Sequence, residues 1–221
     1  MRKVLSLLMI LVVTLVSTTG VFANEKDKSH DYSGVLEIQK EQMDEARVIT
    51  FDEMVKSIAK YNEISEKEAI NRVVNNSTKS KSSKSFKALS ETDKLMELRG
   101  SKYIEYTQTL DVDKYYKPKL VFYCEYSSYG SYGGIKRILD TTMDRKGKQF
   151  SGKIYVNLES AEKIFWKVSG DFYHNGTTTV TGGGEVGIGE NAKVHFSVSG
   201  SSNHYKYFYD SGRKKVGGSI K

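Results

Sequence analysis

Regular alternation of apolar and polar side chains is the feature that most constrains the fold of this chain. From Lys102 onward, eight short stretches alternate at a period of two, which is typical of half-buried β-strands. Turn-forming residues separate them, among them Asn175-Gly176, a dipeptide that favours a tight hairpin. We therefore predict a mainly β fold, an antiparallel β-sandwich or barrel of about eight strands, over residues 101–215. The predicted strands are 102–110, 120–126, 135–143, 154–158, 164–173, 177–181, 194–198 and 205–209.

Two helices are predicted before the strands. The stretches that begin at Thr50 and Ser65 both match the capping-box pattern, in which a hydroxyl residue is followed three positions later by glutamate. Apolar residues spaced three and four apart follow each box, so we predict a short αα-hairpin over residues 50–76. A hairpin of about 25 residues cannot hold a core alone. It must dock on the strands, self-associate or wait for a partner.

The N-terminus has the order of a cleavable signal peptide: basic residues, an apolar run over residues 4–16, and small residues before Ala23. The alternative is an uncleaved membrane anchor. A helix needs about 20 apolar residues to cross a bilayer, and the run is shorter than that. We predict a signal peptide over residues 1–23 with cleavage between Ala23 and Asn24. The expected product is secreted and extracellular, with no stable membrane anchor after cleavage.

Three further segments complete the predicted organisation. Residues 24–49 are charged and read as a flexible lead-in, residues 77–100 as a Ser/Lys-rich linker and connecting segment, and residues 216–221 as a tail. The Ser/Lys-rich run over residues 75–85 is the best candidate for a domain boundary and for proteolysis. A second possibility therefore stays open, in which residues 24–85 are a pro-region removed after export.

Charge and cysteine content limit the function classes. The formal net charge is +7, and residues 86–221 hold 21 Lys and Arg against 15 Asp and Glu. This excess favours anionic partners through salt-screened attraction, although it is equally compatible with solubility alone. Cys124 is the single cysteine, so no internal disulfide can form. Its place in an apolar alternation predicts a buried core residue rather than a nucleophile.

A cluster of tyrosines is the best candidate for a binding site. The stretch YCEYSSYGSYGG spaces three of its tyrosines three residues apart among Ser and Gly, and two basic residues follow. Tyrosine offers a rigid amphipathic contact surface, and neighbouring cations attract anionic groups. If the rings are exposed, this loop is predicted to bind a cell-wall polymer or carbohydrate; otherwise the rings cover the open end of the sandwich. The candidate ligand-binding residues are Tyr126, Tyr129, Tyr132, Lys136 and Arg137.

Catalytic motifs are not found, and we predict no catalytic residue, cofactor or metal. An enzyme would need a cleft where Asp171, Glu185 and a histidine meet. A metal site would need convergence of His174, His195 and His204 with Asp171. Nucleic acid is not expected as a partner of an exported protein.

The stretch 177–199 offers a different function. Alternating Ser/Thr and apolar residues flank the Gly-rich run 182–189, which is better explained as a hairpin bend or bulge than as a phosphate loop. A membrane-inserting hairpin needs the same alternation. The edge strands of ordinary β-sandwiches show this alternation too, so the pattern is compatible with a membrane-inserting hairpin and with a sandwich edge.

The stretches KPKLVFYCEYSSYGSYGGIKRILDTTMDR, FSGKIYVNL and GDFYHNGTTTVTGGGEVGIGENAKVHFSVSGSSNHYKYFY carry a resemblance. From about Tyr103 to Arg213 the chain resembles a group of small secreted proteins of Bacillus and relatives, some of them prophage-borne. The resemblance implies export and a shared β-fold, and it transfers no functional residues. Our leading hypothesis is a secreted non-enzymatic protein whose basic, Tyr-rich β-domain binds cell-envelope or other anionic or carbohydrate surfaces. The alternative is a secreted membrane-active effector or toxin, with residues 24–85 as pro-region or accessory module.

Overall fold

The computed structural model describes residues 45–77, 89–129, 132–201 and 203–216, and all of them belong to one compact unit. Several sequence predictions fall outside these residues: the signal peptide with its cleavage site at Ala23 and Asn24, most of the lead-in, the Ser/Lys-rich run over 78–88 and most of the tail.

The described residues form ten strands and three helices. The helices are α3 (Phe51–Asn62), α4 (Glu66–Ser77) and α6 (Glu91–Gly100). The strands are β1 (Glu45–Ile49), β2 (Lys102–Thr109), β3 (Lys119–Tyr129), β4 (Tyr132–Asp144), β5 (Gln149–Ser160), β6 (Lys163–Tyr173), β7 (Thr177–Gly182), β8 (Val186–Gly187), β9 (Asn191–Ser199) and β10 (His204–Lys215).

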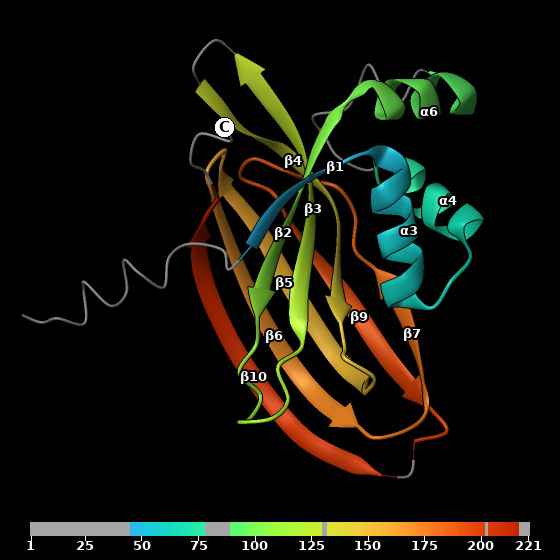
Figure 1. The fold of residues 1–221 in the computed structure, drawn as a ribbon, viewed down its shortest axis with the longest axis vertical. Coiled ribbons are helices and arrows are strands. Elements are labelled where there is room, and N and C mark those ends of the chain that lie inside the picture. The colour runs from blue at the N-terminus through green and yellow to red at the C-terminus, as the bar shows by residue number, and fades with distance from the viewer. Residues whose placement is uncertain (1–44, 78–88, 130–131, 202, 217–221) are drawn as a thin grey trace, which may run out of the picture. The chain divides into compact units, whose positions relative to one another are not determined.

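The strands make two five-stranded sheets in which every pairing of named strands is antiparallel (Figure 1). The first sheet has the order β1-β2-β3-β4-β8, and the second has the order β10-β6-β5-β9-β7. Their inner faces share one hydrophobic core, so the predicted mainly β, sandwich-like architecture is confirmed.

Two strands and one helix depart from the sequence prediction. β1 falls in the predicted flexible lead-in, where it pairs with β2. β8 is only two residues long and pairs with β4. α6 falls in the predicted connecting segment. The eight predicted strands are all present, with ends shifted by up to six residues.

The sandwich core follows from the alternation that predicted the strands. In β6 all the even-numbered residues are buried, and in β5 most of them are, while the odd-numbered residues point outward and are exposed or half-buried. The largest side chains of this core include Trp166, Phe150 and Phe172. Cys124 is fully buried among them, and burial raises the pKa of its thiol. The thiol is therefore a packing group, as the sequence predicted.

The helices pack on the outer face of the first sheet. Thr50 and Glu53 form a reciprocal capping box at the start of α3, and Ser65 and Glu68 form one before α4. Apolar residues of both helices then share a second core with β2, β3 and β4; its members include Met54, Ile58, Val73, Tyr103, Val121, Tyr123 and Leu139. The segment 50–76 is therefore docked on the β-domain through a common core.

Buried polar contacts reinforce this docking. Arg72 of α4 donates two hydrogen bonds to the fully buried Asp140 of β4, at 2.9 and 3.1 Å. Burial raises the pKa of Asp140 although Arg72 acts to lower it. Tyr123 of β3 donates to the hydroxyl of Ser57 on α3 at 2.7 Å. Each of these groups depends on the helix layer to satisfy it.

Two facing glycines of β5 and β6 leave room for the ring of Phe150 to pack against the backbone of both strands. Gly152 lies opposite Gly170, and a Cβ on Gly170 would lie 2.3 Å from the carbonyl oxygen of Ser151. The ring of Phe150 occupies the remaining space, 2.8 Å from the same position. A side chain there must displace backbone atoms, which is costly in a packed sheet.

We expect Gly170→Ala to lower the free energy of unfolding by about 1–3 kcal/mol, the usual cost of overpacking. Urea titration followed by circular dichroism measures it. Gly100→Ala is the matched control, because a Cβ at the end of α6 meets no atom within 4 Å. The control should leave stability unchanged or raise it by up to about 1 kcal/mol. Equal stability of both variants would show that the β5–β6 pair has room for a methyl group.

Candidate functional site

The outward side of the second sheet carries the candidate site. Strands β5, β6 and β9 all place their odd-numbered side chains on this side, where those side chains are exposed or half-buried. They surround a groove of about 570 Å³, a size that suits a small-molecule or oligomer site. Its lining consists of Lys153, Tyr155, Phe165, Lys167, Ser169, Lys193 and His195. We call these seven residues the cationic groove.

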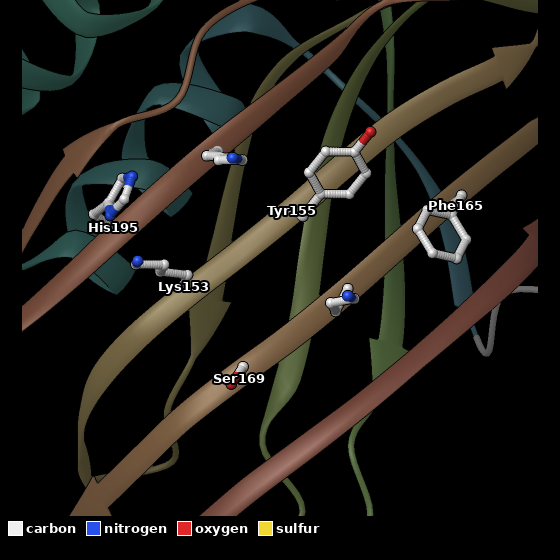
Figure 2. A pocket seen from close by; sticks show the side chains of 7 residues that line it. Lys153, Tyr155, Phe165, Ser169 and His195 are labelled. Carbon is white, nitrogen blue, oxygen red and sulfur yellow. The ribbon is translucent and has the colours of Figure 1, made fainter.

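Strand register brings these distant residues together. Tyr155 lies opposite Lys193 on one side and Lys167 on the other. Lys153 lies opposite His195 and Ser169 in the next row. Figure 2 shows Lys153 and Tyr155 on one strand, with His195 on one neighbouring strand and Phe165 and Ser169 on the other.

The lysines of the groove have few competing partners. Within the described part of the chain, Lys153 and Lys193 make no hydrogen bond or ion pair, and Lys167 lies 5.8 Å from the ring centre of Tyr209. Two carboxylates at outward positions of β5 and β6 are engaged elsewhere: Asp171 with His204 at 2.9 Å, and Glu159 with Arg213 at 2.8 Å. Three ammonium groups therefore remain available to an external anion.

Two aromatic rings form the apolar part of the groove. Tyr155 and Phe165 are half-buried, with their centres 6.0 Å apart and their planes tilted by 66°. The guanidinium of Arg213 lies 5.3 Å from the ring centre of Phe165. Rigid rings beside the groove lysines can contact a ligand that has both an apolar face and negative charge.

The tyrosine loop predicted from the sequence is placed differently from the groove. Tyr126 is half-buried and packs against the sandwich core, and its hydroxyl fills the space beside Gly133. Lys136 is exposed and pairs with Glu125 at 2.9 Å. Tyr129 and Tyr132 face each other at the ends of β3 and β4, but their side chains are outside the described part of the structure. The proposed role of these tyrosines stays a prediction.

Arg137 does not present its charge to solvent, as a role in that loop would require. It is 5% exposed and forms ion pairs with Glu125 and, at 2.6 Å, with Glu185. Burial alone would raise the pKa of Glu125, but the charges of Arg137 and Lys136 hold it below its ordinary value. The carboxylates of Glu125 and Glu185 in turn raise the pKa of Arg137, although burial acts to lower it. This buried triad is a structural element that joins β3 and β4 to the segment before β8.

The other arrangements considered from the sequence are not assembled. Asp171 pairs with His204 on the outward face, whereas Glu185 is buried with Arg137, so they do not form a pair of carboxylates. His195 lines the groove, while His174 packs edge-on against Tyr205. Among the described residues, no group of three His, Cys, Asp or Glu side chains is arranged to hold a metal ion.

Sequence reasoning did not find the groove. Its pattern is present, because Lys153, Lys167 and Lys193 all occupy outward positions of alternating strands. Each lysine alone looks like an ordinary solvated residue. Only the pairing of β5 with both β6 and β9 shows that they share one surface.

Comparison with protein-family models, curated proteins and solved structures gives no match for this chain. Helices of the described residues are all too short or too polar to cross a bilayer.

Proposed function

We propose that this protein is an extracellular, non-enzymatic binding protein whose cationic groove holds an anionic polymer of the cell envelope or another acidic carbohydrate surface. The observation that carries the proposal is the set of three lysines around Tyr155 and Phe165 on the outward face of the second sheet. The opposite outer face, on the first sheet, is occupied by the helices. The groove thus replaces the tyrosine loop as the leading site.

The chemistry of the groove favours a polymer over a single small anion. A solvent-exposed ion pair contributes only about 0.2–1 kcal/mol, so one charged group held by one lysine binds weakly. A chain with repeated charges engages several lysines at once, and each further contact forms at high effective concentration. Such binding weakens as salt screens the charges.

The membrane-active alternative finds less support in the packing. Val194 and Phe196 supply the apolar face of β9, and both are buried in the sandwich core. Thr178 of β7 is also buried and bonds to Gln149 at 2.6 Å. Insertion into a bilayer would first have to extract this hairpin from the core.

The groove is tested by reversing its charge. We expect the triple variant with Lys153→Glu, Lys167→Glu and Lys193→Glu to lose about 10- to 100-fold in affinity for isolated Gram-positive cell walls, as three exposed pairs become repulsive. Sedimentation with walls at low and high salt, with and without their anionic polymers, measures this. The native protein should bind less at high salt.

A matched control separates the groove from net charge. Lys56, Lys67 and Lys102 are exposed lysines outside the groove, and their replacement by glutamate changes the charge of the protein equally. This control variant should keep most of its affinity. If both triple variants lose affinity equally, the groove is not the site, and if the native protein binds no anionic surface, the proposed function is wrong.

Export is the second part of the proposal. The basic, apolar and small-residue segments of residues 1–23 support it. Expression of the full-length chain in a Gram-positive host should release a protein whose first residue is Asn24, as determined by N-terminal sequencing of the medium fraction. A product found only with the cells and retaining Met1 would contradict export.

A further inference from the structure

One cross-strand row of the groove has a regular chemical pattern. Lys193 of β9, Tyr155 of β5 and Lys167 of β6 lie side by side, in that order, across three strands. Neighbouring strands are about 4.8 Å apart, which separates the two lysine Cα atoms by about 10 Å. The row therefore reads cation, ring, cation.

Hydrogen-bonding groups lie on both sides of this row. Ser169 and His195 flank Lys153 in the row on one side. Asn157 lies between Phe165 and Asn191 in the row on the other side. A ligand that lies along the central row would thus meet hydroxyl, imidazole and amide groups at its edges.

We propose that this row binds an acidic polysaccharide in which a charged sugar alternates with a neutral one. Two successive anionic groups of such a chain would contact Lys193 and Lys167, while the apolar C–H face of the neutral sugar between them packs on Tyr155. The flanking Ser169 and His195 side chains would bond to sugar hydroxyls. This assignment rests on the proposed function, since it names the ligand class of the same groove.

The spacing distinguishes this ligand from denser polyanions. A polymer with a charge on every unit, such as polygalacturonate, polyphosphate or single-stranded DNA, places an additional negative charge over the ring of Tyr155. The face of an aromatic ring carries negative electrostatic potential and disfavours that arrangement. Attraction by charge density alone would rank these polymers in the opposite order.

The test compares polymers of equal length at one ionic strength. Fluorescence anisotropy with labelled hyaluronan oligosaccharides, in which uronate alternates with a neutral sugar, is set against labelled polygalacturonate oligomers and single-stranded DNA. We expect the protein that begins at Asn24 to bind hyaluronan about tenfold more tightly than polygalacturonate. Tyr155→Ser should abolish this preference and Tyr155→Phe should keep it. Tyr115→Ser, at an exposed tyrosine outside the groove, should also keep it.

Each other outcome overturns the inference. Binding that follows charge density, or a preference for single-stranded DNA, would remove the alternating polysaccharide while leaving an anion-binding groove in place. If Tyr155→Ser and the native protein prefer hyaluronan over polygalacturonate to the same extent, the ring of Tyr155 has no role in the selectivity. If the native protein binds none of these polymers and no cell wall, the proposed function fails together with the inference.

Discussion

Replacement of Arg137 by methionine is expected to lower the free energy of unfolding by about 3–5 kcal/mol at pH 7, since removing one partner of a buried ion pair leaves an uncompensated charge. Here two carboxylates, those of Glu125 and Glu185, lose the same guanidinium. Methionine keeps much of the side-chain volume of arginine. The decrease in the free energy of unfolding therefore reports the lost charge rather than a new cavity. Urea unfolding followed by tryptophan fluorescence is suitable, because the single Trp166 is in the core.

Acid should reduce this difference. In the native protein the pKa of Glu125 is lowered, so its contribution is present above the ordinary pKa of a glutamate and is lost as the pH falls through the lowered value. In the variant, Glu125 loses the charge of Arg137 and burial raises the pKa of its carboxyl, so the variant becomes relatively more stable as protons bind. The gap between the two proteins should therefore narrow from pH 7 to pH 4.

The adjacent lysine provides the control. Lys136 is exposed and pairs with the same Glu125, so Lys136→Met should cost no more than about 1 kcal/mol. Arg137→Met combined with Glu125→Gln and Glu185→Gln should recover part of the loss, because the buried charges are then absent. Similar losses for Lys136→Met and Arg137→Met would contradict the buried role of Arg137.

A chain that begins at Leu89 is expected to lose cooperative folding altogether. It lacks β1, α3 and α4, which exposes the second core around Val121, Tyr123 and Leu139. It also leaves the buried Asp140 without Arg72. Each large apolar side chain contributes about 1.5–3 kcal/mol when buried, whereas a whole domain is stable by only about 5–15 kcal/mol. The loss of several such buried side chains therefore costs more free energy than the whole domain has in net stability.

A chain that begins at Glu41 is the matched truncation, because it retains the whole compact unit. Its unfolding midpoint in urea should equal that of the longer protein, while the Leu89 chain should show a broad transition and bind a hydrophobic dye. If the Leu89 chain unfolds as sharply and at the same midpoint, the helices are dispensable. That result would favour the interpretation of residues 24–85 as a removable pro-region.

The strands that could be predicted from the sequence are those with one buried and one outward face. β1 was missed because four of its five residues are exposed and it shows no alternation. β8 has two residues and exists only through its pairing with β4. Ser90 caps the start of α6 by accepting a hydrogen bond from the backbone N–H of Asp93, but the helix buries only Leu98, so it lacks the apolar stripe that identifies an amphipathic helix.

The site was less predictable than the fold, for a related reason. A sequence shows that Lys136 and Arg137 are neighbours, but it does not show that the β3–β4 register shifts beside them or that both side chains pair with Glu125. One of them is exposed and the other is buried. Conversely, Lys153, Lys167 and Lys193 are far apart in the sequence and meet only through strand register. Surfaces built across strands depend on pairings that local patterns do not specify.

The short excursion through β8 has a consequence for the chemical environments in which the protein can work. After β7 of the second sheet, the chain crosses to pair with β4 of the first sheet and then returns to the second sheet as β9. Glu185 anchors this crossing to Arg137. Some β-sandwiches tie their sheets together with a cystine, but in this fold peptide backbone and an ion pair make that link, and the lone thiol of Cys124 is buried in the core. The fold should therefore be indifferent to redox potential and mature without an oxidising catalyst, intact in reducing and oxidising surroundings alike.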